Sequence, residues 1–342
     1  MRTNVITGAT GHLGNVLART VCARGELVRA VLQPGDDAAP LAGVPVEVVE
    51  ADVRDGAALE RAFRGADRVF HLAGLVSITA GREALLEAVN VGGTRAVVDA
   101  CCAAGVGRLV YMSSVHALIE PKGGLLTEAA GFDAAQATSP YGKSKAAASQ
   151  VVRDAARAGR LDTVLVLPTG VVGPFDFRLS EVGQLLLDLE AQRVPFLLPG
   201  GHDWVDVRDV ALGTLAAAER GRPGEAYLLG GEHLTLTRLA EVVSLETRCR
   251  VPRVLPAGFA RLVASGAPLW ERVTGRRALL TPYAVHALTV PFRVSHEKAA
   301  RELDYLPRPV AQSLREALEW HHARTGAPRR VGPARAQPGM AS

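Results

Sequence analysis

The chain has 342 residues, 48% of them hydrophobic and 22% charged, which is ordinary globular usage and excludes a disordered or collagen-like chain. This length suits about two domains with a sizeable hydrophobic core. Most of the net charge of +4 comes from residues 326–342, which hold three arginines and no acid, and the remaining +1 gives no support for a nucleic-acid partner.

Short β-branched runs alternate with helical patterns through the first half of the chain. Strands are expected at Asn4–Thr7, Leu27–Leu32, Val46–Glu50, Arg68–Leu72, Leu109–Ser113 and Asp162–Leu167. Helices are expected at Asn15–Arg24, Ala57–Phe63, Arg82–Ala104 and Ser139–Ala158. This alternation predicts an α/β fold with a doubly wound parallel sheet of Rossmann type.

The second half is less regular, with proline-marked loops and short helices such as Leu236–Thr247 and 312–324. We interpret residues 1–175 as a dinucleotide-binding domain to which some later segments return. Residues 176–325 are expected to form mainly a smaller substrate-binding domain, and residues 326–342 a disordered tail. Asp209 is expected to cap the start of a helix, and His321 and His322 to lie on a solvated helix face.

The expected compartment is the cytoplasm. The longest uncharged run, Thr3–Ala18, has sixteen residues, whereas a membrane span needs about 20 mostly apolar ones, so no membrane partner is expected. A strand begins directly after Arg2, which leaves no room for a signal peptide. The four cysteines lack zinc-ligand spacing and are expected to be reduced.

A glycine-rich turn follows the first expected strand and opens a helix. Gly8 permits a tight turn, Gly11 lets the backbone approach a pyrophosphate, and Gly14 permits close contact between helix and strand. The helix N-terminus favours the same anion. The sequence therefore predicts dinucleotide binding here, and the cofactor-binding residues of the turn are Gly8, Thr10, Gly11, His12, Leu13 and Gly14.

The phrase Thr7–Gly14 resembles that of the extended short-chain dehydrogenase/reductase superfamily, which includes the NAD-dependent epimerases and dehydratases. Three further phrases follow in family order: Asp52–Val53, His71–Gly74 and Asn90–Thr94. The resemblance covers about residues 3–325. It implies that Asp52 and Val53 end the third strand and contact adenine, and that Leu72, Ala73 and Gly74 close the fourth strand beside the cofactor.

The choice between NAD(H) and NADP(H) stays open. A ribose 2′-hydroxyl is usually held by an acid at the end of the second strand, and a 2′-phosphate by an arginine. Gln33 occupies this place and is neither. Asp36 and Asp37 follow shortly after, beyond a Pro34–Gly35 pair that could turn them away.

Tyr141 and Lys145 are four residues apart on an expected helix and so share one face. A free phenol titrates near pH ~10, and a nearby ammonium favours its ionised form and brings the pKa towards working pH. Behind a dinucleotide-binding turn, this pair predicts proton transfer by Tyr141, tuned by Lys145. The resemblance also implies that Lys145 holds the nicotinamide ribose.

The third catalytic residue is expected at the end of the preceding strand, where Ser113 and Ser114 both stand. The family pattern favours Ser114 as the hydrogen-bond donor to the substrate carbonyl, which leaves Ser113 a packing role. Asn90 has two readings of equal weight, namely a backbone cap within the long helix or a catalytic residue that orders a proton-relay water.

The phrase 167–175 is similar to that of dihydroflavonol 4-reductase and cinnamoyl-CoA reductase relatives. The resemblance implies that the backbone of Pro168, Gly170 and Val171 meets the nicotinamide carboxamide. Sugar-nucleotide epimerases usually carry Asn in place of Gly170, and dehydratases carry Asp-Glu where this chain has Val115 and His116. His116 is a candidate substrate contact, with a solvated side chain as the alternative.

We therefore expect an NAD(P)-dependent reductase or alcohol dehydrogenase acting on a small-molecule carbonyl or alcohol. In it, Tyr141 moves the proton, Lys145 tunes Tyr141, and Ser114 steadies the oxyanion. The alternatives are a sugar or sugar-nucleotide epimerase with tightly bound NAD and a non-catalytic dinucleotide sensor. No metal site is expected, since His202 and its neighbouring aspartates do not converge, and relatives often form homodimers through two helices.

Overall fold

The computed structural model describes residues 1–77, 81–256, 286, 288–290 and 292–326, so the expected tail 327–342 lies outside the described residues. The central sheet has seven strands, all parallel, in the order β3-β2-β1-β4-β5-β7-β11. The strands are β1 (Thr3–Thr7), β2 (Leu27–Leu32), β3 (Glu47–Glu50), β4 (Arg68–His71), β5 (Arg108–Met112), β7 (Thr163–Pro168) and β11 (Ala226–Leu229).

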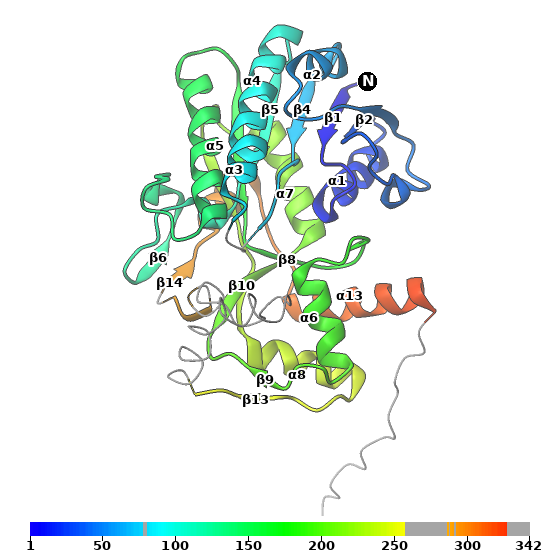
Figure 1. The fold of residues 1–342 in the computed structure, drawn as a ribbon, viewed down its shortest axis with the longest axis vertical. Coiled ribbons are helices and arrows are strands. Elements are labelled where there is room, and N and C mark those ends of the chain that lie inside the picture. Colours follow the sequence, from blue (N-terminus) through cyan, green and yellow to red (C-terminus); the bar gives the residue numbers. More distant parts are fainter. Residues whose placement is uncertain (78–80, 257–285, 287, 291, 327–342) are drawn as a thin grey trace, which may run out of the picture.

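Helices cover both faces of this sheet (Figure 1). One face packs against α1 (His12–Ala23), α7 (Val207–Arg220) and α12 (Glu297–Leu303). The other packs against α2 (Gly56–Phe63), α4 (Gly93–Ala104) and α5 (Pro140–Arg157). Because both faces are buried, the inner strands are rich in apolar residues, as β7 shows with all six residues buried, whereas the edge strand β3 is mostly exposed. The predicted α/β fold with a parallel sheet is confirmed.

The strand order reverses beside β1, which pairs with β2 on one side and β4 on the other. The connections that follow β1 and β4 run to opposite sides of this point. They leave a crevice at the carboxyl ends of the strands, where ligands bind in doubly wound sheets. The glycine turn after β1 and the segment after β4 both reach this crevice. The topology thus places the predicted cofactor residues at the switch point.

A second group of elements lies at the carboxyl end of the sheet, below it in Figure 1. A small sheet joins β12 (Glu232–Thr235), β10 (Gly201–Asp206) and β8 (Gly170–Val172). A separate apolar core lies between this sheet and the helices α6 (Glu181–Glu190), α8 (Leu236–Thr247) and α13 (Val310–Thr325). The remaining elements are α3 (Glu83–Leu86), β6 (Gly124–Leu126), β9 (Phe196–Leu197), β13 (Arg253–Val254) and β14 (Phe292–Val294).

The long helix expected at Arg82–Ala104 is present from Glu83 to Ala104 and consists of α3, a π-helical turn at Glu87–Gly92, and α4. Two other expectations are corrected. The N-cap of α7 is Asp206, not Asp209, which pairs instead with Arg308. His321 is buried and His322 pairs with Glu190, so the expected solvated face of α13 is wrong.

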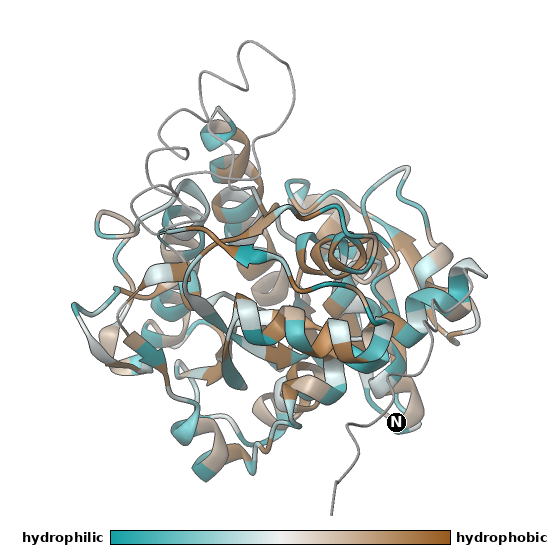
Figure 2. Cartoon of the chain, turned by 90° about the horizontal axis from the view of Figure 1, so that it is seen from below, coloured by the Kyte–Doolittle hydropathy of each residue, from teal (hydrophilic) through white to brown (hydrophobic). Residues whose placement is uncertain are grey.

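Hydrophobic and hydrophilic residues alternate along the helices, as the brown and teal segments of Figure 2 show. This periodicity lets each helix bury one side against a sheet and expose the other. None of the helices in the described part of the chain is long and apolar enough to cross a bilayer.

Candidate active site

A cavity of about 330 Å³ opens at the carboxyl ends of β1, β2 and β4. Nine residues predicted to bind the cofactor line it: Gly8, Thr10, Gly11, Gln33, Asp52, Val53, Leu72, Ala73 and Gly74. Asp52 and Val53 lie just beyond the last residue of β3, Glu50, rather than ending that strand. Leu72, Ala73 and Gly74 likewise follow β4. The structure therefore gathers four separate phrases of the sequence around one cavity.

The glycine turn forms a cradle that side chains would fill. Gly8 has a φ of +71°, and a Cβ there would lie 2.7 Å from the Ala73 nitrogen. A Cβ on Gly14 would lie 2.8 Å from the Ala9 Cα. Gly11 is the N-cap of α1, and within the described residues no side chain caps that helix end. The first amides of α1 are therefore available to an anion, and the turn suits the pyrophosphate of a dinucleotide.

Other predicted cofactor residues lie outside this cavity. The His12 ring is turned to the Pro174 carbonyl oxygen, 3.0 Å from Nε2, and Leu13 packs against the core. Pro168 ends β7, and Gly170 and Val171 begin β8. Their expected contact with the nicotinamide carboxamide stays a prediction.

The three expected catalytic residues come from two neighbouring elements. Ser114 stands two residues after β5 and caps a 3₁₀ turn at Val115–Ala117, where its Oγ accepts a hydrogen bond from the His116 amide at 3.3 Å. Tyr141 and Lys145 are buried in the first turns of α5. Helix α5 packs against that 3₁₀ turn. The fold thus brings the residues around Ser114 to the start of α5.

Lys145 joins the two elements directly. Its Nζ donates a hydrogen bond to the Met112 carbonyl oxygen at 2.7 Å, at the end of β5, and lies 4.9 Å from the centre of the Tyr111 ring. Burial disfavours the ammonium form and lowers the pKa of Lys145 from 10.5 to about 8. Lys145 still carries most of its charge at neutral pH, as a residue that favours ionised Tyr141 requires.

Gly142 allows the close approach of α5 to the 3₁₀ turn at Val115–Ala117. A Cβ at this position would lie 2.6 Å from the His116 carbonyl oxygen and 3.1 Å from the Ser139 Oγ. Ser139 itself caps α5 by accepting a hydrogen bond from the Gly142 amide at 3.0 Å. The residue directly after Tyr141 must therefore lack a side chain if α5 is to begin against the 3₁₀ turn.

Asn90 lies in the π-helical turn, the kind of helix irregularity that often marks functional sites. Its Oδ1 accepts from the Leu75 amide at 2.7 Å, and its Nδ2 donates to the Leu75 carbonyl oxygen and to Ser144 Oγ, each at 2.9 Å. These hydrogen bonds hold the segment after β4 to the start of α5. The Asn90 side chain therefore contacts the backbone of another segment and does not cap its own helix, and a role in a proton relay stays a prediction.

Ser113 and Ser114 take different environments. The Ser113 hydroxyl lies 2.6 Å from the Ser149 hydroxyl inside the contact between β5 and α5. This is the packing role expected for Ser113, and it leaves Ser114 as the serine beside the 3₁₀ turn.

Two histidine rings extend the site beyond Tyr141. The His116 ring lies 6.4 Å from the Tyr141 ring, and the His202 ring of β10 stacks on His116 at 5.7 Å with an interplanar angle of 14°. Burial, aided by nearby His286, lowers the pKa of His116 to about 4, so this ring is neutral at physiological pH. His202 was not expected to contribute to the site, because only the fold brings β10 to the start of α5.

The cofactor cavity also holds residues that sequence analysis did not place there. Leu75, Leu85, Val89 and Arg54 line it, together with Asp36 and Arg178. The sequence left the direction of Asp36 after Pro34–Gly35 open, and the structure turns it into the cavity. No local sequence pattern indicates that Arg178 lies here, since it comes from the segment between β8 and α6.

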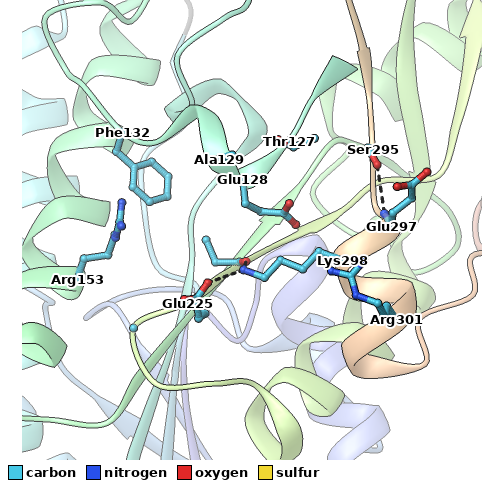
Figure 3. A pocket seen from close by; sticks show the side chains of 12 residues that line it. Thr127, Glu128, Ala129, Phe132, Arg153, Glu225, Ser295, Glu297, Lys298 and Arg301 are labelled. Carbon is cyan, nitrogen blue, oxygen red and sulfur yellow. Dashed lines mark hydrogen bonds and ion pairs between the residues drawn. The ribbon is translucent and has the colours of Figure 1, made fainter. Parts of the chain in front are cut away.

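A second cavity, of about 390 Å³, lies against the outer edge of β11 (Figure 3). Three of its charged residues have partners: Lys298 Nζ donates to Glu225 at 2.6 Å and to the Ala226 carbonyl oxygen at 2.8 Å, and Glu128 accepts from the Leu228 amide at 2.7 Å. These contacts satisfy the free edge of the sheet. The cavity contains none of the predicted site residues, so the candidate active site is the smaller cavity at the switch point together with the start of α5.

Comparison with known proteins identifies the family of the chain. The NAD dependent epimerase/dehydratase family matches residues 4–230. The chain is 36% identical to sterol demethylase protein B of Methylococcus capsulatus, over 94% of this chain and 99% of that protein. It is 31% identical to a protein provisionally named dihydroflavonol 4-reductase from Synechocystis sp., over 92% and 93% of the two chains.

Among solved structures, the crystal structure of gox2253 superimposes with a TM-score of 0.83 and 30% identity, covering 97% of this chain and 100% of that one. The predicted resemblance to the extended short-chain dehydrogenases/reductases and to dihydroflavonol 4-reductase-like proteins is confirmed. The cofactor class, a nicotinamide dinucleotide, follows from the same membership. The chain belongs to the NAD-dependent epimerase/dehydratase family and is an oxidoreductase of the short-chain dehydrogenase/reductase type.

Proposed function

We propose that the protein interconverts a small organic ketone or aldehyde and its alcohol, with Ser114, Tyr141 and Lys145 as catalytic residues. The dinucleotide, when bound, supplies or accepts the hydride at the substrate carbon. In reduction the Tyr141 hydroxyl gives its proton to the substrate oxygen, and in oxidation it takes that proton back. Ser114 donates a hydrogen bond to the same oxygen as negative charge develops on it.

The observation that carries this proposal is the hydrogen bond from Lys145 Nζ to the Met112 carbonyl oxygen. It fixes the ammonium between the end of β5, which leads into Ser114, and the turn of α5 that holds Tyr141. A positive charge favours the ionised form of a phenol near it, and Tyr141 lies one helical turn before Lys145 on α5. Lys145 therefore lowers the free energy needed for Tyr141 to release its proton.

Gly170 supports a reductase over a sugar-nucleotide epimerase. A Cβ on Gly170 would lie 2.7 Å from a Trp204 ring carbon and 2.9 Å from a His202 ring carbon. The asparagine that epimerases usually carry would therefore displace both rings. Elimination is also disfavoured, since the positions of the dehydratase carboxylates hold Val115 and His116.

We propose a neutral, largely apolar substrate. Apolar contact in the small cavity beside His116 and His202 comes from Val115, Leu126 and Phe292. Its two acids, Glu120 and Asp203, already accept hydrogen bonds from Thr138 and from the Gly231 amide. The neutral His116 ring can hydrogen-bond an oxygen substituent without needing an opposite charge. One relative is named for sterol demethylation and another for reduction of a dihydroflavonol, and both names refer to ring-bearing compounds.

The test is a Tyr141→Phe variant assayed with NADH and NADPH against a panel of ketones and aldehydes. We expect kcat to fall at least about 100-fold while the cofactor Kd stays within about threefold, because the hydroxyl is needed only for proton transfer. Tyr227→Phe is the matched control, since the Tyr227 hydroxyl contacts Glu302 on α12 at the edge strand. Near-normal turnover by the Tyr141 variant would overturn the proposal.

A further inference from the structure

A charge pair stands at one end of the cofactor cavity. Thr10 Oγ1 donates a hydrogen bond to Asp36 Oδ2 at 2.6 Å, and Arg178 Nη2 donates to Thr10 Oγ1 at 2.8 Å. Arg178 also forms an ion pair with Asp36. All three residues line the cavity, so the pair lies directly beside the glycine turn.

The local chain explains why Asp36 faces this cavity. Pro34 and Gly35 are the central residues of a turn that is closed by a hydrogen bond from the Asp36 amide to the Gln33 carbonyl oxygen at 2.9 Å. Gly35 has a φ of +77°, which suits a type II turn with proline before it. The turn folds the chain back towards Thr10. The turn therefore brings the Asp36 carboxylate into the same cavity as Gln33, which occupies the position at the end of the second strand where related sheets usually carry an acid.

The other cationic residue in the cavity lining, Arg54, also has a partner. Arg54 donates to both carboxylate oxygens of Asp52, at 2.9 Å from Nε and 2.6 Å from Nη2. Asp36 and Asp52 thus balance Arg178 and Arg54 within the lining. Burial works against ionisation of Asp36, but hydrogen bonds from Thr10 and Arg178 outweigh it and lower its pKa. Asp36 is therefore a carboxylate at neutral pH.

We propose that the pair of Asp36 and Arg178 selects NAD(H) over NADP(H). The carboxylate of Asp36 accepts a hydrogen bond from the 2′-hydroxyl of the adenosine ribose. A 2′-phosphate would bring about two negative charges against this carboxylate, and Arg178 could meet the phosphate only by leaving Asp36. The inference rests on the dinucleotide-dependent function proposed above and names its cofactor.

The pair has a direct test in cofactor binding, which does not require turnover. NADH and NADPH are titrated separately into the full-length protein and its Asp36→Asn, Arg178→Gln and Asp37→Asn variants, and nicotinamide fluorescence gives each Kd. We expect the unaltered protein to bind NADH at least about tenfold more tightly than NADPH. Asp37→Asn is the matched control, since it removes the same charge one residue further on and outside the cavity lining.

The two variants of the pair should act in opposite directions on NADPH. Asp36→Asn removes the repulsion and releases Arg178, so NADPH binding should tighten and NADH binding weaken, each by about threefold to tenfold. Arg178→Gln leaves the carboxylate without its cation, so NADPH binding should weaken further while the Kd for NADH changes less than about threefold. Asp37→Asn should change neither ratio.

Three results would overturn the inference: tighter binding of NADPH by the unaltered protein, an unchanged ratio in Asp36→Asn, or an equal shift in Asp37→Asn. Thermal unfolding of each variant checks that it is folded. NADH-selective binding without turnover of any carbonyl compound would contradict the proposed function and leave this inference standing. A protein that binds neither cofactor would contradict both.

Discussion

His71 Nε2 lies 3.1 Å from the Thr94 hydroxyl, and this hydrogen bond joins β4 to α4 next to the cofactor cavity. The Thr94 hydroxyl donates its hydrogen bond to the Asn90 carbonyl oxygen at 2.6 Å. Nε2 must therefore carry the proton of the ring, and Nδ1 accepts from the Thr7 hydroxyl at 2.8 Å. His71 is a neutral imidazole in one fixed tautomer.

His71 should make the protein sensitive to acid. Burial, with a further contribution from Lys145, lowers the pKa of His71 from 6.5 to about 3. Between these values the unfolded chain binds a proton that the folded chain does not, so the free energy of unfolding falls as the pH drops through this range. We expect the stability advantage over a His71→Leu variant to shrink by about 2 kcal/mol between pH 7 and pH 5. Urea unfolding of both proteins at each pH checks this, and a constant difference would contradict it.

Lys145 should make the stability of the protein depend on pH in the alkaline range. The unfolded chain keeps its proton up to a pKa of 10.5, whereas the folded chain loses it near 8, so stability rises with pH between these values. At pH 7, desolvation of the charged Lys145 amine costs about 3 kcal/mol of folding free energy. Lys145→Met removes this cost but also removes the hydrogen bond from the charged amine to Met112, and this loss offsets most of the gain. We expect the variant to be inactive and about as stable as the parent at pH 7, and less stable by about 3 kcal/mol at pH 10. Equal unfolding free energies for the two proteins at pH 10 would refute this.

The sequence predicts six of the seven strands of the central sheet, because most of them are buried runs bounded by turn residues, whereas the edge strand β11 was not predicted. Strand β2 lies at the predicted residues, Leu27–Leu32, between Gly25 and Pro34. The short strands of the second group were not predicted. Strand β8 has three residues, and its pairing of Gly170 with Trp204 joins segments that only the folded chain brings together.

The site residues also fall into two groups, those found from local sequence patterns and those that only the fold brings into the site. The glycine turn and the helical spacing of Tyr141 and Lys145 are local patterns, so their surroundings could be predicted. The direction of Asp36 depends on the φ of Gly35, which the sequence leaves open. Arg178 reaches Asp36 across 142 positions of sequence, and no local pattern announces such a contact.

Gly142 should be essential for activity although it carries no functional group. In Gly142→Ala the added Cβ would meet the His116 carbonyl oxygen at 2.6 Å, so the start of α5 must move away from Ser114. We expect kcat to fall at least about 100-fold, since small displacements of catalytic groups have such effects. Gly56→Ala is the matched control, because a Cβ at this helical position meets nothing within 4 Å and should raise the free energy of unfolding by about 0.5 kcal/mol. Equal activity of the two variants would contradict the close contact.

His116 and His202 should act on substrate binding and leave cofactor binding unchanged. Phenylalanine at either position keeps a stacked ring but removes the nitrogens that can hydrogen-bond an oxygen substituent. We expect His116→Phe and His202→Phe to raise KM by about tenfold while the Kd for NADH stays within about threefold. His296→Phe is the control, since the His296 ring lies against Tyr305 at the start of α12. Because the pKa of His116 is about 4, its titration should also be absent from the activity profile between pH 5 and pH 8. A KM unchanged in both variants would place the substrate elsewhere, and the stacked pair would then serve to pack β10 against the start of α5.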